Sequence, residues 1–465
     1  MRKTLLLLLL VLGTLTCRAQ GAGAFGDYLR RSEASARAYR GRKTTERADF
    51  LRRSWRQYRL FAGVRDPFRD GDAGRPSGPD GQDTTDVNVP DGGRELPVAP
   101  RRREDPPVKP GTLAFSFYGQ RVSVACPAGG AFTLQELSEA AVAAAWEQLD
   151  KGAGPGMVQA CQERRRRDAL CDWAYLQLAD SLSHAACPDA ENGRQLLLGY
   201  LLARSGLLMR YGSTDDALVC LYGTGEVVYE QSCYLEDGIR YYRLRESDGG
   251  LRLSAPCPDA RPLDFAVTAP PRFQDGPVCV RHIEAAGISL DFRIPRALLD
   301  FYDAYPHTEL RYKADAVVSA PMQEQVYPVL KQAIAGKGQA EAANILLHFV
   351  QRQSGYRTDG SYWGREKWNF PEESLFYPYG DCDDHAILYA RLVRDLLGLD
   401  VLLVYCVVDG GPHAATAVAF TEAAPGDSFL HGGVRWWYCE PTASRADVGQ
   451  RCWKHYVIQR ADVIR

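Results

Sequence analysis

Residues 377–386 read Tyr-Pro-Tyr-Gly-Asp-Cys-Asp-Asp-His-Ala, and they continue directly into Ile-Leu-Tyr-Ala-Arg-Leu-Val-Arg-Asp-Leu-Leu, which ends at residue 397. Apolar side chains recur here with the spacing of one helix face, at positions 386, 389, 390, 393, 396 and 397. Gly398 follows, and glycine commonly ends a helix. The pattern therefore predicts a helix that begins at Cys382 and is closed by Gly398.

The start of this helix is a favourable place for a reactive thiol. Free backbone amides and the positive end of the helix dipole lower the pKa of a thiol and can also receive an oxyanion. Asp383 and Asp384, in the first turn, oppose formation of a thiolate, so a thiolate at Cys382 needs a partner cation. The alternative is a buried structural cysteine, and the Gly-Asp-Cys sequence alone does not decide between the two.

Two predicted strands follow the helix. Residues 401–408 form an almost unbroken apolar run, which predicts a buried strand. The sequence Asp-Gly-Gly-Pro at 409–412 predicts a turn, and residues 413–420 then predict a second strand. His413 opens this second strand, where a side chain can be presented beside a cleft.

A third predicted strand covers residues 434–440 and stops before Pro441. Strand alternation places Glu440 on the face of Tyr438 and Trp436, and it places Cys439 on the other face. Cys439 is therefore the weaker candidate for a nucleophile.

Taken together, the three segments resemble the transglutaminase-like superfamily of papain-fold thiol enzymes, in its exported bacterial form. Members carry a Gly-x-Cys segment that opens a helix, a His that starts a strand and an Asp at an Asp-Pro-Thr-like strand end. The resemblance covers about residues 322–442, most closely 377–442. It implies a catalytic triad in which Cys382 attacks an acyl carbon, His413 relays the proton and Glu440 holds the imidazole.

The sequence departs from the family at two points and leaves one role open. Glu440 stands where the family usually has Asp, and Ala414 follows the histidine where Trp is common. The resemblance implies a papain-like core, in which the helix bearing the cysteine packs on an antiparallel sheet bearing His and Glu. The Cys382 amide can supply one side of an oxyanion hole. The candidates for a side-chain donor are Tyr377, Tyr379 and Trp368.

Two other histidines are weaker candidates for chemistry. His385 lies one helical turn from Cys382, and we expect its side chain to face a neighbouring loop or solvent, with a supporting role beside the triad as the alternative. His348 falls within a predicted helix and is expected to pack.

Composition and charge narrow the class of protein. The 465 residues are 45% hydrophobic and 25% charged, which is typical of a globular protein with more than one domain. The formal net charge of −2 gives no reason to expect nucleic acid as a partner. The cysteines form no CxxC pair and no Cys/His cluster at zinc spacing. We therefore expect no metal and no cofactor, and the sequence does not choose disulfide partners.

The N-terminus resembles an export signal. Arg2 and Lys3 precede an apolar run at residues 5–12, and small residues follow up to Ala19. This pattern predicts a secretory signal peptide over residues 1–19, and therefore a periplasmic or secreted protein. A lipid anchor at Cys17 is the alternative. No later stretch reaches the roughly 20 apolar residues of a membrane helix.

Composition divides the rest of the chain into four parts, and overall the fold class is predicted to be α+β. Residues 20–65 predict a basic helical segment that could contact a cell-envelope partner. Residues 66–110 are rich in Pro, Gly and Asp and predict a disordered linker. Residues 111–320 predict a mixed α+β region, and residues 321–465 predict the thiol domain. Helices are expected over 157–184 and 322–335, and a strand over 227–234.

The α+β region can be interpreted as a degenerate copy of the thiol domain. Residues 191–206 follow the pattern of residues 382–398, a helix closed by glycine and followed by strands. Aligning Gly206 with Gly398 places Ala190 where Cys382 would be, so such a copy would be noncatalytic. The alternative is coincidence, because a helix, a glycine and a strand commonly follow one another.

The predicted function is cysteine-dependent acyl transfer on a peptide or protein substrate, most simply by a peptidase or amidase through a thioester. One alternative is a noncatalytic binding or scaffold protein of the cell envelope. A second alternative is a protein-crosslinking transglutaminase, which requires an amine-accepting side of the cleft.

Overall fold

The computed structural model describes residues 111–126, 134, 136–244, 250–257, 259–273, 276–408, 411–452 and 456–464. The predicted signal peptide, basic helical segment and linker lie outside these residues. Nearly all described residues belong to one compact unit, Ala73–Asp409 with His413–Arg465. Among the described residues, no helix is both long and apolar enough to cross a bilayer.

The chain folds as a mixed α+β protein whose main sheets are antiparallel, which confirms the predicted class. The first half begins with the hairpin of β1 (Thr112–Phe117) and β2 (Gln120–Ala125). Four helices follow: α2 (Glu139–Lys151), α3 (Gly154–Arg167), α4 (Asp172–Ala186) and α5 (Glu191–Arg204). A sheet then forms from β3 (Met209–Ser213), β4 (Leu218–Thr224), β5 (Cys233–Glu236), β6 (Ile239–Arg243) and β7 (Arg252–Leu253).

The second half also begins with a hairpin, of β8 (Val278–Ala285) and β9 (Ile288–Pro295). Its helices are α6 (Arg296–Asp303), α7 (Arg311–Ala314), the π-helix η2 (Met322–Val326), α8 (Tyr327–Ile334), α9 (Gln339–Gln353), α10 (Asp359–Tyr362), α11 (Pro371–Phe376) and α12 (Cys382–Leu397). The short strands β10 (Gly355–Tyr356) and β11 (Tyr379–Gly380) pair in parallel. The final sheet contains β12 (Val401–Val408), β13 (Gly411–Val418), β14 (Ser428–His431), β15 (Val434–Cys439) and β16 (Tyr456–Ile464).

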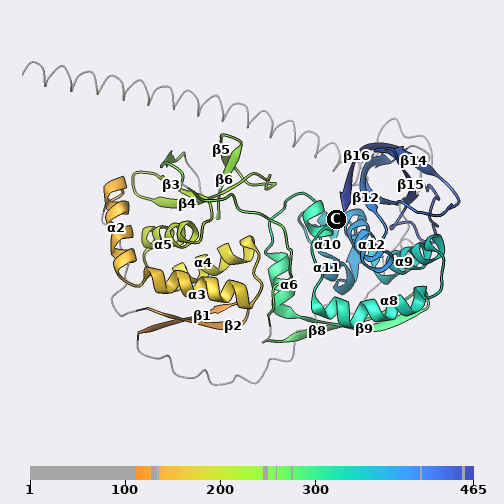
Figure 1. Ribbon diagram of the computed structural model, residues 1–465, viewed down its shortest axis with the longest axis horizontal. Helices are drawn as coiled ribbons and strands as arrows, with labels where there is room; N and C mark the ends of the chain where they lie inside the picture. The colour runs from red at the N-terminus through yellow and green to blue at the C-terminus, as the bar shows by residue number, and fades with distance from the viewer. Residues whose placement is uncertain are drawn as a thin grey trace, which may run out of the picture. The chain divides into compact units, whose positions relative to one another are not determined.

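Helix α12 forms where the sequence predicted it and is the central helix of the second half. Tyr389 and its apolar neighbours at 386, 390 and 393 are fully buried, so the predicted apolar face is the buried face. Gly398 ends the helix in the left-handed conformation, with φ of 64°. The helix packs against α9 and β12 (Figure 1), and this packing places Cys382 beside the sheet.

The two five-stranded sheets have the same strand order. The first is β5-β6-β4-β3-β7 and the second is β14-β15-β13-β12-β16, so each strand has a counterpart at the same place in chain order. In each half the helix before the sheet is followed by a left-handed glycine, Gly206 or Gly398, and the first strand starts three residues later. The hairpin β1–β2 contacts α3 and α4, as the hairpin β8–β9 contacts α8 and α9. The two halves therefore share a strand order, and the duplication stays a prediction.

The strand registers identify the counterparts of the three predicted site residues. The last ladder pair between β13 and β15 is Thr416 with Cys439, and the corresponding pair between β4 and β6 is Leu221 with Arg243. Counting from these pairs places Leu218 at the position of His413 and Leu244 at that of Glu440. With Ala190 at the position of Cys382, these three positions hold no thiol, no base and no carboxylate.

Three predicted elements differ from the structure. The helix expected over 157–184 is two helices, α3 and α4, because Ala169 between them has a φ of 52° and turns the chain. Of the strand expected over 227–234, only the end becomes β5, and Val228 before it is buried without strand pairing. The helix expected over 322–335 begins as a π-helix and ends at Ile334. In each case packing overrides local propensity.

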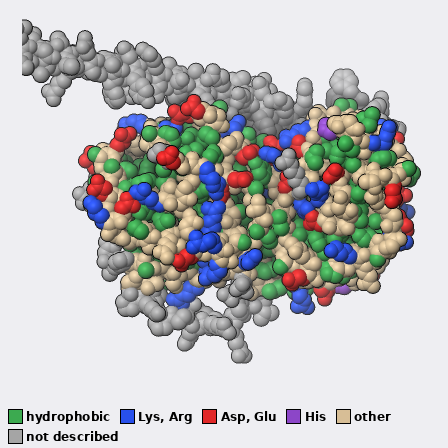
Figure 2. Space-filling view, in the orientation of Figure 1, with side chains coloured by type: hydrophobic (Ala, Val, Ile, Leu, Met, Phe, Trp, Pro, Cys, Tyr) green, Lys and Arg blue, Asp and Glu red, His purple; other side chains and the backbone are tan. Residues whose placement is uncertain are grey.

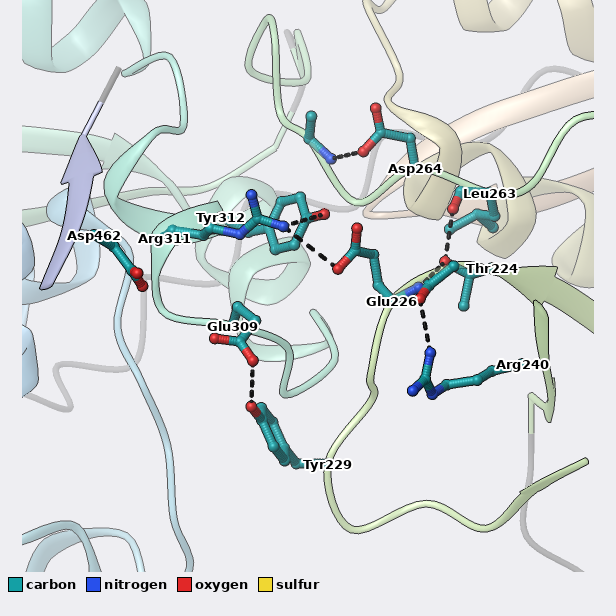
Figure 3. A network of polar contacts seen from close by, with 12 residues as sticks. Thr224, Glu226, Tyr229, Arg240, Leu263, Asp264, Glu309, Arg311, Tyr312 and Asp462 are labelled. Atoms are coloured by element: carbon teal, nitrogen blue, oxygen red, sulfur yellow. Dashed lines mark hydrogen bonds and ion pairs between the residues drawn. The ribbon is translucent and has the colours of Figure 1, made fainter. Parts of the chain in front are cut away.

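A polar network joins the β4 region to the chain around α7. Tyr229 Oη donates to Glu309 Oε1 at 2.6 Å, and Arg311 Nη2 lies 3.5 Å from Glu226 Oε2 (Figure 3). The Arg460 guanidinium of β16 also pairs with Glu309, at 2.8 Å. Of these contacts, the pair of Arg460 and Glu309 crosses the predicted boundary at residue 321.

Candidate active site

The predicted triad residues come from three elements of the second half. Cys382 is the first residue of α12 and is half-buried, His413 lies in β13, and Glu440 directly follows β15. The backbone N–H of Ala414 lies near enough to the Cys382 sulfur to lower the pKa of the thiol. The structure therefore places the residue next to His413 against the thiol.

Glu440 binds the imidazole of His413 through one ring nitrogen. His413 Nε2 lies 2.9 Å from Glu440 Oε2 and 3.1 Å from Oε1, and both side chains are buried. A carboxylate accepts hydrogen bonds, so it fixes the proton on Nε2. Nδ1 is then the basic nitrogen of the neutral ring, and an adjacent base is what activates a thiol nucleophile.

The Glu440 carboxylate has further donors. Tyr438 Oη donates to Oε2 at 2.5 Å, and Thr442 Oγ1 donates to Oε1 at 2.6 Å. Burial raises the pKa of Glu440, but the charge of His413 and the hydrogen bonds from His413, Thr442 and Tyr438 outweigh it, and the pKa falls to about 2. The carboxylate therefore stays ionised and can stabilise an imidazolium.

The thiol itself is held in its neutral form. Burial raises the pKa of Cys382, the charges of Asp383 and Glu440 raise it further, and the backbone N–H of Ala414 only partly opposes them. The sulfur lies 3.8 Å from Asp383 Oδ1. This is the opposition from first-turn acids that the sequence predicted, so the thiol needs a base to remove its proton during the reaction.

Sequence reasoning missed one side chain at the site, Tyr356. It lies in β10 and pairs with Gly380, two residues before Cys382. Burial raises the pKa of Tyr356, and of the neighbouring charges Cys382 raises it most. Its hydroxyl makes no hydrogen bond to any residue the structure describes. A protonated hydroxyl beside the nucleophile is a natural oxyanion donor. No sequence motif marks it, because the parallel pairing of β10 with β11 brings it there.

The three predicted donors make other contacts. The indole of Trp368 stacks on His307 with ring centroids 5.6 Å apart. The Tyr377 ring packs edge-on against Trp363 at 4.7 Å. The guanidinium carbon of Arg357 lies over the Tyr379 ring, 3.8 Å from the centroid of that ring.

Of the two surroundings expected for His385, a neighbouring loop and solvent, the structure shows the first, and His348 lies in a helix as expected. The side chain of His385 is buried and its Nε2 lies 2.7 Å from Ser354 Oγ, because this face of α12 packs on the end of α9. Burial lowers the pKa of His385 to about 4, so the ring is neutral. His348 lies in α9, with its Nε2 2.9 Å from Asp447. Cys439 is fully buried and receives a hydrogen bond from Tyr389 Oη at 3.6 Å.

Several buried carboxylates surround the start of α12. Oxygens of Asp359, Asp381 and Asp384 lie within 4.8 Å of one another. Burial raises the pKa of Asp359 to about 9, and Asp383 and Asp384 contribute to that rise. Burial and Asp383 likewise raise the pKa of Asp381 and Asp384. The pKa of each of these three carboxyl groups is therefore raised, although the charge of Lys367 lowers that of Asp384 in part.

Comparison of the sequence with protein-family models gives no match. Comparison with curated proteins gives no match either. The function is therefore argued from the geometry of the site.

Proposed function

We propose that the protein is an exported cysteine-dependent acyl-transfer enzyme, a peptidase or amidase of the papain-like, transglutaminase type. The observation that carries this proposal is the buried hydrogen-bonded pair of His413 and Glu440. The Cys382 sulfur lies near the backbone N–H of Ala414, the residue after His413. A helix with the cysteine at its start, packed on an antiparallel sheet that carries the histidine, supports the papain-like interpretation.

The proposed reaction has two halves. His413 Nδ1 takes the thiol proton as the Cys382 sulfur bonds to the carbonyl carbon of the substrate. The negative oxygen of the tetrahedral intermediate is stabilised by the backbone N–H of Cys382, at the start of α12, and by the Tyr356 hydroxyl. As the C–N bond breaks, the imidazolium returns its proton to the leaving amine. Water then attacks the thioester carbon while His413 takes its proton. The C–S bond breaks, the imidazolium returns the proton to the Cys382 sulfur, and the carboxylic acid leaves. A crosslinking transglutaminase would replace this water by an amine.

A noncatalytic binding role is the second candidate, and an arginine cluster favours it. Arg165 and Arg261 both pair with Asp172, and Arg167 pairs with Asp168 at 2.9 Å. Arg167 and Arg261 are exposed. Figure 2 shows Lys and Arg side chains gathered in a band on the face in view. An anionic cell-envelope partner is the kind that such a surface would attract.

The deciding experiment is labelling with an acyl-directed thiol probe, with the modified residue mapped by mass spectrometry. We expect rapid labelling at Cys382 in the wild type and none in Cys382→Ala. Cys452 is exposed and is not one of the three proposed catalytic residues, so Cys452→Ala is the matched control and should label at Cys382 as the wild type does. Peptide and cell-envelope extracts processed by the wild type and not by Cys382→Ala would then identify the substrate.

Unchanged labelling of Cys382→Ala would overturn the assignment of the nucleophile. A Cys382 that reacts no faster than Cys452, together with extracts that stay unprocessed, would favour the binding role.

A further inference from the structure

We propose that the start of α12 is a binding site for an oxygen-preferring divalent cation, Ca²⁺ or Mg²⁺, with Asp359, Asp381 and Asp384 as ligands. This goes beyond the proposed function and does not depend on it. It also departs from the sequence-based expectation that the protein binds no metal.

The three carboxylates converge from two elements. Asp359 is the first residue of α10, Asp381 is the residue before α12, and Asp384 lies in the first turn of α12. They are only 3%, 8% and 0% exposed. One oxygen from each lies within 4.8 Å of the others, a separation that one ion can bridge. Oxygen ligands of this kind are those that Ca²⁺ and Mg²⁺ prefer.

A second observation indicates that a ligand is missing from this cluster. Asn369 is fully buried, and its Nδ2 donates to Asp384 Oδ2 at 2.9 Å. The Oδ1 of the same amide accepts no hydrogen bond from the described residues, and neither does Asp381 Oδ1. Buried polar atoms are normally satisfied, because each orphan costs about 1–3 kcal/mol. A bound cation would interact favourably with both of these unpaired oxygens, because a cation is attracted to hydrogen-bond acceptors and to carboxylates.

Lys367 and Lys313 lie near enough to act on Asp384 through their charge, but their direct contacts go to other groups. Lys367 Nζ pairs with Glu373 Oε1 at 2.5 Å, and Lys313 Nζ donates to the carbonyl of Trp368. Among the described residues, no ion pair includes Asp359, Asp381 or Asp384. The donors to Asp359 and Asp384 include the backbone amides of Lys367 and Asn369, at 2.7 and 2.8 Å. Amides orient a carboxylate but carry no charge, so a bound cation would supply the direct charge contact that the described residues do not give these carboxylates.

A cation here would act on the position of the nucleophile. Asp381 and Asp384 flank Cys382 and its neighbour in sequence, and Asp359 lies close to β10, which carries Tyr356. Binding would tie these segments together around the thiol. The ion would thus order the site without contacting the substrate.

The test uses the full-length Cys382→Ala protein, so that binding is measured apart from catalysis. Isothermal titration with Ca²⁺, Mg²⁺ and Mn²⁺ should show one site, with a dissociation constant of about 10⁻⁶ to 10⁻³ M for the preferred ion. Thermal unfolding should shift upward with ion concentration. Adding Asp359→Asn should weaken binding at least about tenfold, because a charged ligand is lost. Asp400→Asn, an exposed residue paired with Arg394, is the matched control and should bind normally.

Asp359→Asn removes a buried repulsion, so without ions it should be at least as stable as its parent, which separates lost binding from misfolding. The proposal is wrong if none of the three ions binds at 10 mM, about tenfold above the weak end of that range. It is also wrong if Asp359→Asn binds as tightly as its parent. Binding of Zn²⁺ alone, by the wild type and not by Cys382→Ala, would overturn it as well, because the ligand would then be the thiol.

Discussion

Residue 440 is a Glu, whereas the family that the sequence resembles usually has Asp at this position. The contacts of Glu440 show how the longer side chain is held. It bonds to His413, Tyr438 and Thr442, and its backbone carbonyl accepts from Gln351 Nε2 at 3.0 Å. All of these donors come from the sheet, the turn after it or α9. The exchange therefore does not by itself argue against a working triad.

Replacing Glu440 with Gln should disable the base while keeping the shape of the site. The amide cannot stabilise an imidazolium, and it can select the wrong tautomer of His413. We expect kcat on the substrate found by extract profiling to fall by about 10³-fold. Tyr438→Phe removes one donor to the same carboxylate and is the milder comparison, with a loss of about tenfold. Equal activity of Glu440→Gln and the wild type would contradict the assigned role.

The same carboxylate gives a pH dependence to stability. The folded pKa of Glu440 is about 2, below its ordinary value of 4.5, so the unfolded chain binds more protons between these values. Its contribution, about 3 kcal/mol from the shift, is therefore present above about pH 4.5 and is lost as the pH falls toward 2. Urea unfolding from pH 5 to 2 should show a steeper loss for the wild type than for Glu440→Gln. Parallel curves would show that the carboxylate is not held as described.

Tyr356 is expected to act on the transition state and not on the thiol. Loss of its hydroxyl in Tyr356→Phe should lower kcat by about 10²-fold, as for other oxyanion donors, with little change in KM. The rate of alkylation of Cys382 by iodoacetamide should stay within about twofold, because alkylation forms no oxyanion. A variant with normal kcat would remove Tyr356 from the mechanism.

Helices α5 and α12 differ in sequence, but both end in the same way. Each is followed by a glycine with positive φ, 77° at Gly206 and 64° at Gly398. A Cβ at either position would meet no atom within 4 Å, so only backbone conformation requires glycine there.

Alanine at these glycines should therefore cost similar amounts of stability. We expect Gly398→Ala and Gly206→Ala each to lower the free energy of unfolding by about 1 kcal/mol, measured by denaturant titration. Gly360→Ala is the control, because Gly360 has ordinary φ and open space, and it should be close to neutral. A loss confined to one of the two closing glycines would weaken the correspondence between the halves.

At the scale of the whole molecule, the matching strand orders support the proposal that the chain is a duplication with one chemically silent half. The positions of the triad in that half hold Ala190, Leu218 and Leu244, which are all apolar. Leu218 N donates instead to the side chain of Asn192 on α5, at 2.8 Å. These three positions of the first half therefore hold apolar side chains, where the second half has the residues of the proposed triad.

The contacts around Tyr229 should matter for stability and not for chemistry. Tyr229 bonds to Glu309, and its ring packs edge-on against Trp368 at 5.6 Å. Tyr229→Ala should lower the free energy of unfolding by about 2–3 kcal/mol through lost packing and the lost hydrogen bond. Labelling of Cys382 should be unchanged, with Tyr229→Phe as the milder control. Reduced labelling in a folded Tyr229→Ala protein would show that these contacts support the site.

The sequence by itself determined the elements whose signals are local. Periodicity and Gly398 specified α12, and the apolar run at 401–408 specified a buried strand, because side-chain spacing reports which face is buried. The glycine alignment also pointed to the relation between the halves. By contrast, the local sequence pattern did not predict the break at Ala169 or the short β5.

Only the tertiary structure decided which groups meet around the nucleophile. His413 and Glu440 were expected together, but Tyr356, the buried position of His385 and the cluster of Asp359 with Asp384 were not. These contacts join residues up to about 30 positions apart through the parallel pairing of β10 and β11 and the packing of α9 on α12. No local pattern encodes such pairings, because their free energy comes from burial that exists only once the elements are assembled.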